Sequence, residues 1–163
     1  MADHTPGPRA RPPRGRSRPP RGIPQTPLVV AGPFGAALDA RRTAEALSRG
    51  LLRGGRPAAD VCPLEPTGVA PAGALDAVDF DARLRRARAV IVAIERLGRR
   101  ALPGTIVFEV ATRARQGGVP AYAVAASDSL DLFDARMMDL QVILHAHGSR
   151  GLTAAGRTLA AII

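Results

Sequence analysis

The chain has 163 residues, the length of one ordinary domain, and 23 basic residues against 14 acidic ones give it a net charge of +9. Every basic residue is arginine, so the chain lacks the lysine that a Walker-type phosphate-binding loop requires. Cys62 is the only cysteine, which excludes an intramolecular disulfide and a paired-cysteine metal site and is typical of a reducing compartment. The sequence has no run of about 18 apolar residues, so we expect a cytoplasmic protein that does not enter the membrane.

Residues 1–26 are rich in proline, arginine and glycine. Six arginines are opposed only by Asp3, so this segment carries +5 of the net charge and the rest of the chain +4. So few apolar side chains cannot offset the entropy lost on ordering, and we expect a disordered tail. The tail either makes a weak, sequence-independent contact with nucleic acid or is a solvated extension. No aromatic residue lies between the arginines for a base to stack on.

From Pro27 onward, short apolar runs alternate with amphipathic stretches, which is the pattern of βα units in a single domain over residues 27–163. The expected strands are Pro27–Ala31, Asp60–Leu64, Ala89–Ile94, Ala121–Ala126 and Gln141–Ala146. The expected helices are Asp39–Arg53, Phe80–Arg88, Thr105–Gln116, Asp131–Asp139 and Leu152–Ile163, with a proline-, glycine- and alanine-rich connection over Glu65–Val78. The sequence therefore predicts an α/β fold, a Rossmann-like doubly wound parallel sheet of about five strands in a three-layer α/β/α arrangement.

Ligands of such sheets bind beyond the carboxyl ends of the strands, which directs attention to the loops there. Two of these loops place glycine at the start of a helix, where backbone N–H groups and the helix dipole favour anions. The residues that would contact a nucleotide or another anion are Gly32, Phe34 and Gly35 in the first loop and Gly104 and Thr105 in the third. A tight turn is the alternative interpretation of the first loop.

The third loop also carries Arg96, Arg99 and Arg100, whose guanidinium groups could hold a phosphate. A solvated arginine-rich loop is the alternative interpretation. His145 and His147 could face one side of a strand end, but two ligands are too few for a metal site, and we predict none.

Other polar residues suggest no nucleophile. The serines near Asp128 belong to no defensible catalytic triad, and Ser127–Ser129 is more simply the cap of the following helix.

Three blocks of the chain resemble the glycerate kinases of the bacterial two-domain type in order and spacing. They are Phe34–Gly50, Asp79–Leu97, and Gly117–Ala125 followed by Gly151–Leu159. The family's enzymes are more than twice as long, and their second domain would be missing between about residues 66 and 76. The resemblance thus implies the Rossmann-like half of that fold.

The family transfers a phosphoryl group from ATP to glycerate with magnesium, using carboxylates and lysine to position and neutralise charge. This chain departs from the family at those charged positions. Uncharged residues replace them at Gly32, Gly35, Ile94, Gly98 and Thr105, and only Glu65, Thr67 and Gly68 represent the family's Asp-Gly-Gly-Glu-Gly-Thr segment. The matching residues of the third loop are Arg96, Leu97, Leu102 and Gly104.

These departures leave two expectations for the function. The first is a glycerate kinase-like protein with weak or no activity, in which Glu95 and Arg96 are the catalytic candidates and ATP with Mg²⁺ the cofactors. The second is a non-catalytic module on the same half-fold that binds a small phosphorylated or carboxylate ligand, or a protein partner. Because the missing second domain would leave part of the sheet uncovered, a homodimer is a further expectation.

Overall fold

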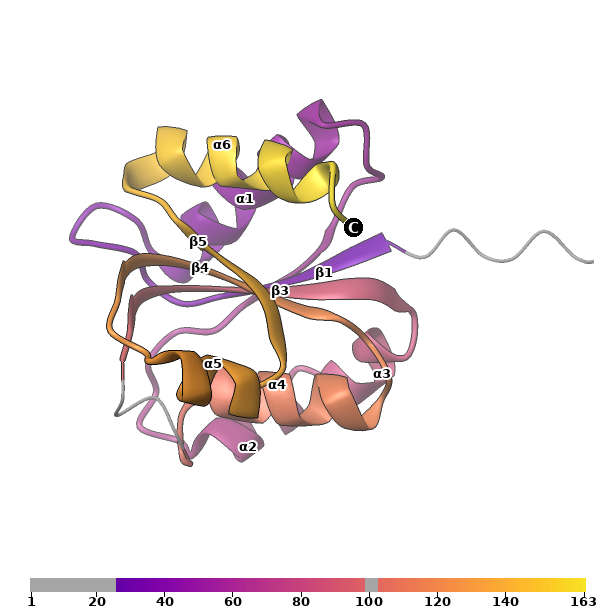
Figure 1. Ribbon diagram of the computed structural model, residues 1–163, viewed down its shortest axis with the longest axis vertical. Helices are drawn as coiled ribbons and strands as arrows, with labels where there is room; N and C mark the ends of the chain where they lie inside the picture. The colour runs from indigo at the N-terminus through magenta and orange to yellow at the C-terminus, as the bar shows by residue number, and fades with distance from the viewer. Residues whose placement is uncertain (1–25, 99–102) are drawn as a thin grey trace, which may run out of the picture.

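A five-stranded sheet lies between two layers of helices in the computed structural model, which describes residues 26–98 and 103–163 (Figure 1). Neighbouring strands are all parallel, in the order β2-β1-β3-β4-β5. The predicted three-layer α/β fold is confirmed.

The strands are β1 (Thr26–Ala31), β2 (Asp60–Pro63), β3 (Ala87–Leu97), β4 (Ala121–Asp128) and β5 (Leu140–His145). The helices are α1 (Ala40–Arg53), α2 (Pro71–Asp76), α3 (Phe80–Leu84), α4 (Ile106–Gln116), α5 (Leu132–Met137) and α6 (Gly148–Ala160). The tail expected over residues 1–26 lies outside the described residues except for Thr26, the first residue of β1.

Each face of the sheet buries its own apolar cluster. Side chains alternate between the faces of a strand, so Leu28 and Val30 pack on the side of α2 to α5, whereas Val29 and Ala31 pack on the side of α1 and α6 (Figure 1). All four are fully buried, as in a parallel sheet that is covered on both sides. The sheet is therefore a rigid platform whose carboxyl edge carries the loops of interest.

The connection between β2 and β3 is more ordered than the sequence predicted. It contains the helix α2, which begins with a proline in its first turn and fully buries Leu75. The helix expected over Phe80–Arg88 is too long: α3 ends at Leu84, and residues from Ala87 onward belong to β3. Short elements of this kind are fixed by burial more than by local periodicity.

The strands and helices near the carboxyl end of the chain also differ from the predicted limits. β3 and β4 run past Ile94 and Ala126, because their pairing continues to Leu97 and Asp128. The helix predicted to reach Asp139 stops earlier, since Asp139 adopts a left-handed conformation with φ of 54°. α6 begins at Gly148, four residues before the predicted start.

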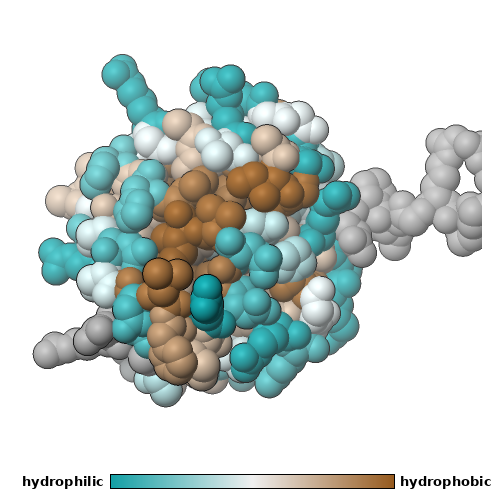
Figure 2. Space-filling model, viewed as in Figure 1, coloured by the Kyte–Doolittle hydropathy of each residue, from teal (hydrophilic) through white to brown (hydrophobic). Residues whose placement is uncertain are grey.

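Some apolar side chains remain on the surface. Leu132 and Phe133 of α5 are 77% and 70% exposed, and β5 is an edge strand with half-buried apolar residues. Figure 2 shows apolar surface across the viewed face, in the region where Figure 1 places β5 and α5. The predicted homodimer would have this surface available, and the dimer stays a prediction. None of the described helices is long and apolar enough to cross a bilayer.

Candidate ligand-binding site

The strand order defines where a ligand would bind. β1 leads into α1 on one face of the sheet, and its neighbour β3 leads toward α4 on the other (Figure 1). The point at which the connections diverge is the usual ligand crevice of a doubly wound sheet. The Gly32 amide donates a hydrogen bond to the Ala93 carbonyl over 3.0 Å, which holds the end of β1 against β3 at this point.

A cavity of about 420 Å³ opens where β3 ends and α4 begins. Its polar lining residues are Glu95 and Arg96, both exposed, together with Thr105. Its other lining residues are Ile94, Gly98, Ile106 and Val107. The structure thus brings three predicted site residues to one place. A volume of this size falls within the range of small-molecule sites.

The start of α4 forms one wall of the cavity. Thr105 is the N-cap of this helix, and its hydroxyl oxygen accepts a hydrogen bond of 3.3 Å from the Phe108 amide. Gly104 has a φ of 98°, a conformation that L side chains rarely adopt, and it does not line the cavity. The two residues therefore shape the turn into the helix, and only Thr105 reaches the cavity.

The residues of the first loop make contacts within the domain, and the expected contact of this loop with a cofactor stays a prediction. Phe34 is only 3% exposed and packs in the core on the α1 and α6 side, and its amide donates to the Leu38 carbonyl over 2.8 Å. Gly35 occupies a left-handed turn with φ of 69°. Neither residue, nor Gly32, lines the cavity.

Carboxylates of the chain itself occupy the start of α1. Asp39 is the N-cap, and its side chain accepts a hydrogen bond of 2.7 Å from the Arg42 amide. Glu65, from the loop after β2, accepts one of 3.0 Å from the Ala40 amide. These two amides, which an anion would otherwise use, are already bonded. The role of Glu65 could not be found from sequence spacing, because it lies 25 residues from its partner.

The remaining sequence candidates lie elsewhere. Arg99, Arg100 and Leu102 fall outside the described residues. His145 ends β5 and His147 precedes α6. Across residues 26–98 and 103–163, three or more histidine, cysteine, aspartate or glutamate side chains gather nowhere as potential metal ligands.

The predicted cap over Ser127–Ser129 is wrong. Ser127 and Asp128 are the last residues of β4, and Asp131 caps α5 by accepting a hydrogen bond from the Asp134 amide. Pairing of β4 with the long strand β3 extends the strand through these polar residues.

Cys62 lies in β2 and is 1% exposed, outside the cavity lining. Burial raises the pKa of its thiol above the usual value, and the charge of Arg83 opposes this effect. The thiol therefore behaves as a core group and not as an activated nucleophile.

Comparisons with known proteins add distant structural likenesses. No protein-family model matches the chain, and no curated protein matches it in sequence. Glycerate kinase 2 from Salmonella typhimurium LT2 is similar over 64% of this chain and 27% of its own, with 20% identity and a TM-score of 0.44. Diflavin flavoprotein A3 from Nostoc sp. is similar over 85% of this chain and 93% of the matched chain, with 14% identity and a TM-score of 0.45. With such low values, neither likeness carries an argument about the activity of this chain.

Proposed function

We propose that this domain binds a small ligand with a phosphate or carboxylate group in the cavity between β3 and α4, without transferring a phosphoryl group. The observation that carries the proposal is the cavity itself, in which Arg96 and Thr105 lie beside apolar side chains at the carboxyl edge of the sheet. A guanidinium group binds phosphate or carboxylate through paired hydrogen bonds, and apolar walls hold the rest of a small ligand.

The composition of the cavity favours binding over catalysis. Glu95 is the only carboxylate among the described residues that line it. Mg²⁺ in a nucleotide site is commonly held by one or two carboxylates together with phosphates and water. Glu95 alone could hold the ion, but no second carboxylate or lysine would then position the reacting groups. The residues present therefore fit a metal-free anion better than a magnesium nucleotide.

Weak phosphoryl transfer from ATP to glycerate is the second candidate function. It is favoured by the presence of Glu95 and Arg96 in one cavity, where the first could accept a proton and the second could stabilise negative charge. ADP formation that depends on Mg²⁺ and glycerate, and that is lost in Glu95→Gln, would establish this function. Absence of turnover at high enzyme concentration would exclude it.

Thermal stabilisation tests the binding proposal. The full chain would be melted with inorganic phosphate, glycerate, phosphoglycerate or ADP, and a ligand at about 100 times its Kd should raise the free energy of unfolding by about 2.7 kcal/mol. Arg96→Gln should reduce this gain. Arg88→Gln is the matched control, because Arg88 is an exposed arginine near the opposite end of the same strand. Equal stabilisation of all three proteins would contradict the proposal.

A further inference from the structure

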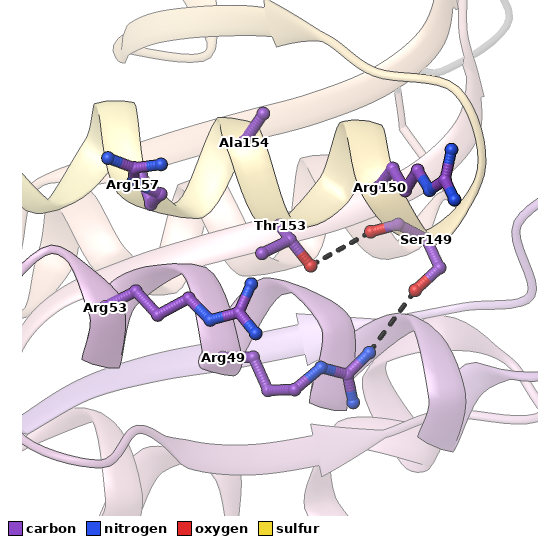
Figure 3. Close-up of a pocket in the computed structure, with 7 residues that line it drawn as sticks. All are labelled: Arg49, Arg53, Ser149, Arg150, Thr153, Ala154 and Arg157. Atoms are coloured by element: carbon purple, nitrogen blue, oxygen red, sulfur yellow. Dashed lines mark hydrogen bonds between the residues drawn. The ribbon is translucent and has the colours of Figure 1, made fainter.

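A second polar depression lies on the other side of the molecule, between α1 and α6 (Figure 3). This groove has a volume of about 410 Å³ and is lined by four arginines. Figure 3 shows Arg49 and Arg53 reaching from α1, while Arg150 and Arg157 stand toward opposite ends of the lining segment of α6. We refer to these four residues and the space between them as the arginine groove.

Among the described residues, the arginine groove has no countercharge of its own. None of the described residues that line it is acidic, and none of its four arginines takes part in an ion pair with another described residue. One hydrogen bond of 3.3 Å links a guanidinium nitrogen of Arg49 to the Ser149 hydroxyl across the groove. Elsewhere in the domain arginines do find carboxylates, as Arg113 does with Asp76 and Asp81. The groove therefore holds four positive charges available to an anionic partner.

The walls of the arginine groove are held at a fixed separation. The two helices run in the same direction and touch at Gly50 and Gly156, where a Cβ added to Gly156 would lie only 2.9 Å from the Gly50 Cα. The Thr153 hydroxyl lies 3.0 Å from both the Ala46 carbonyl on the facing helix and the Ser149 carbonyl of its own helix, and its one hydrogen is shared between them. Because the backbones cannot slide or separate easily, the arginines project from a rigid support.

The shape of the groove favours an extended partner. A second hollow of about 420 Å³ adjoins it and shares Arg53 and Arg157, so the positive surface continues along the helix pair. Measured along the helix axis, the backbone positions of Arg49 and Arg53 in α1 are separated by about 6 Å, and those of Arg150 and Arg157 in α6 by about 10 Å. Ala154 is the only apolar residue among the described residues that line the groove, whereas a site for a small molecule usually has mostly apolar walls.

We infer that the arginine groove binds the phosphodiester backbone of a nucleic acid without reading its base sequence. Guanidinium groups pair with phosphate oxygens, and such contacts supply the sequence-independent part of nucleic-acid affinity. In the part of the chain that the structure describes, no aromatic side chain lines the groove for a base to stack on, so the phosphates carry the interaction. This site is separate from the cavity between β3 and α4 and would function whether or not that cavity binds a ligand.

The inference predicts a specific dependence on salt. Four phosphate contacts to a DNA duplex correspond to a slope of about −3.6 in a plot of log affinity against log salt concentration. Arg53→Gln combined with Arg157→Gln removes two of these contacts and should make the slope less steep by about 1.8. All four arginines are exposed or partly exposed surface residues, so folding of the variant is not at risk.

Fluorescence anisotropy of the full chain with a labelled short duplex, measured between about 50 and 200 mM salt, tests the inference. The matched control is Arg85→Gln with Arg86→Gln, which removes the same charge from exposed positions outside the groove. The slope of the groove variant should be less steep than that of the wild type by about 1.8, the control should keep the wild-type slope, and two unrelated sequences should bind equally.

Several outcomes would overturn the inference. One is equal weakening in the two variants, which would mean that only net charge matters. A second is the absence of binding at the lowest salt concentration. A third is full displacement of the duplex by polyglutamate or by inorganic pyrophosphate, each added so that its carboxylate or phosphate groups equal the phosphate groups of the duplex in concentration. Displacement by polyglutamate would indicate an acidic protein partner, and displacement by pyrophosphate a small phosphate site.

Discussion

Replacing Gly156 with alanine should destabilise the domain, although alanine is the better helix former. The added Cβ would press on the Leu47 carbonyl and lie 3.0 Å from the Leu51 amide nitrogen. These are backbone atoms, so no side-chain rotation relieves the contact and the helices must separate. Overpacking of this kind costs about 3 kcal/mol. If α1 and α6 move apart by about 1 Å to relieve it, the remaining contacts between the two helices are also weakened. The helix propensity of alanine returns about 1 kcal/mol. We therefore expect a net loss of about 2 kcal/mol.

Gly151→Ala is the matched control in the same helix. The three atoms nearest to a Cβ at this position would all belong to Ala146, at 3.4 to 3.5 Å, which is ordinary van der Waals contact. The control should therefore gain up to about 1 kcal/mol from helix propensity. Urea denaturation of wild type and both variants measures the difference. A Gly156→Ala protein as stable as the Gly151→Ala protein would refute the close packing of α1 against α6.

Four further predictions follow from other contacts. Arg113→Gln should cost about 1–2 kcal/mol in urea denaturation, because Arg113 bridges carboxylates of α2 and α3 and is 16% exposed; no loss would contradict a structural role for this network. Glu65→Ala removes the carboxylate that accepts a hydrogen bond from the first amide of α1, and it should lower the free energy of unfolding by about 1 kcal/mol in the same assay. An unchanged free energy of unfolding would mean that water replaces the carboxylate without loss and would contradict this prediction. Cys62 has a pKa raised above 9.0 in the folded state, so its contribution to stability is complete below that pH and falls as the pH rises beyond it. The decline in stability above pH 9.0 should be smaller in Cys62→Ala than in the wild type, and parallel profiles would contradict this. Phe133→Ser should change stability by less than about 0.5 kcal/mol, since the side chain is 70% exposed, while weakening any self-association seen by sedimentation velocity.

The sheet could be predicted from the sequence because its strands are short apolar runs separated by amphipathic helices. Val29 and Val30 are typical of such a run, and both are fully buried. The limits of elements were less predictable. Leu75 is buried by contacts with residues distant in the sequence, and no periodicity within the short helix α2 indicates this. The continuation of β3 through Glu95 and Arg96 depends on pairing with β4, which local sequence cannot show.

The candidate site was partly predictable for the same reason. The rule that ligands bind beyond the carboxyl ends of strands selected the loop of Glu95, Arg96 and Thr105, and these residues line one cavity. The rule also selected the first loop, but it cannot tell which backbone amides the chain satisfies internally. The burial of Phe34 could not be predicted, because it depends on the packing of α1 against one face of the sheet.

The most direct test of the account is to locate a bound anion by NMR. Phosphoglycerate would be titrated into ¹⁵N-labelled full-length protein, with the amide signals of both candidate surfaces assigned. The account predicts saturating shifts at Glu95, Gly98 and Thr105, which Arg96→Gln removes while Arg88→Gln does not. Shifts confined to the arginine groove, at Ser149 and Thr153, or no shifts at all would contradict a ligand site between β3 and α4.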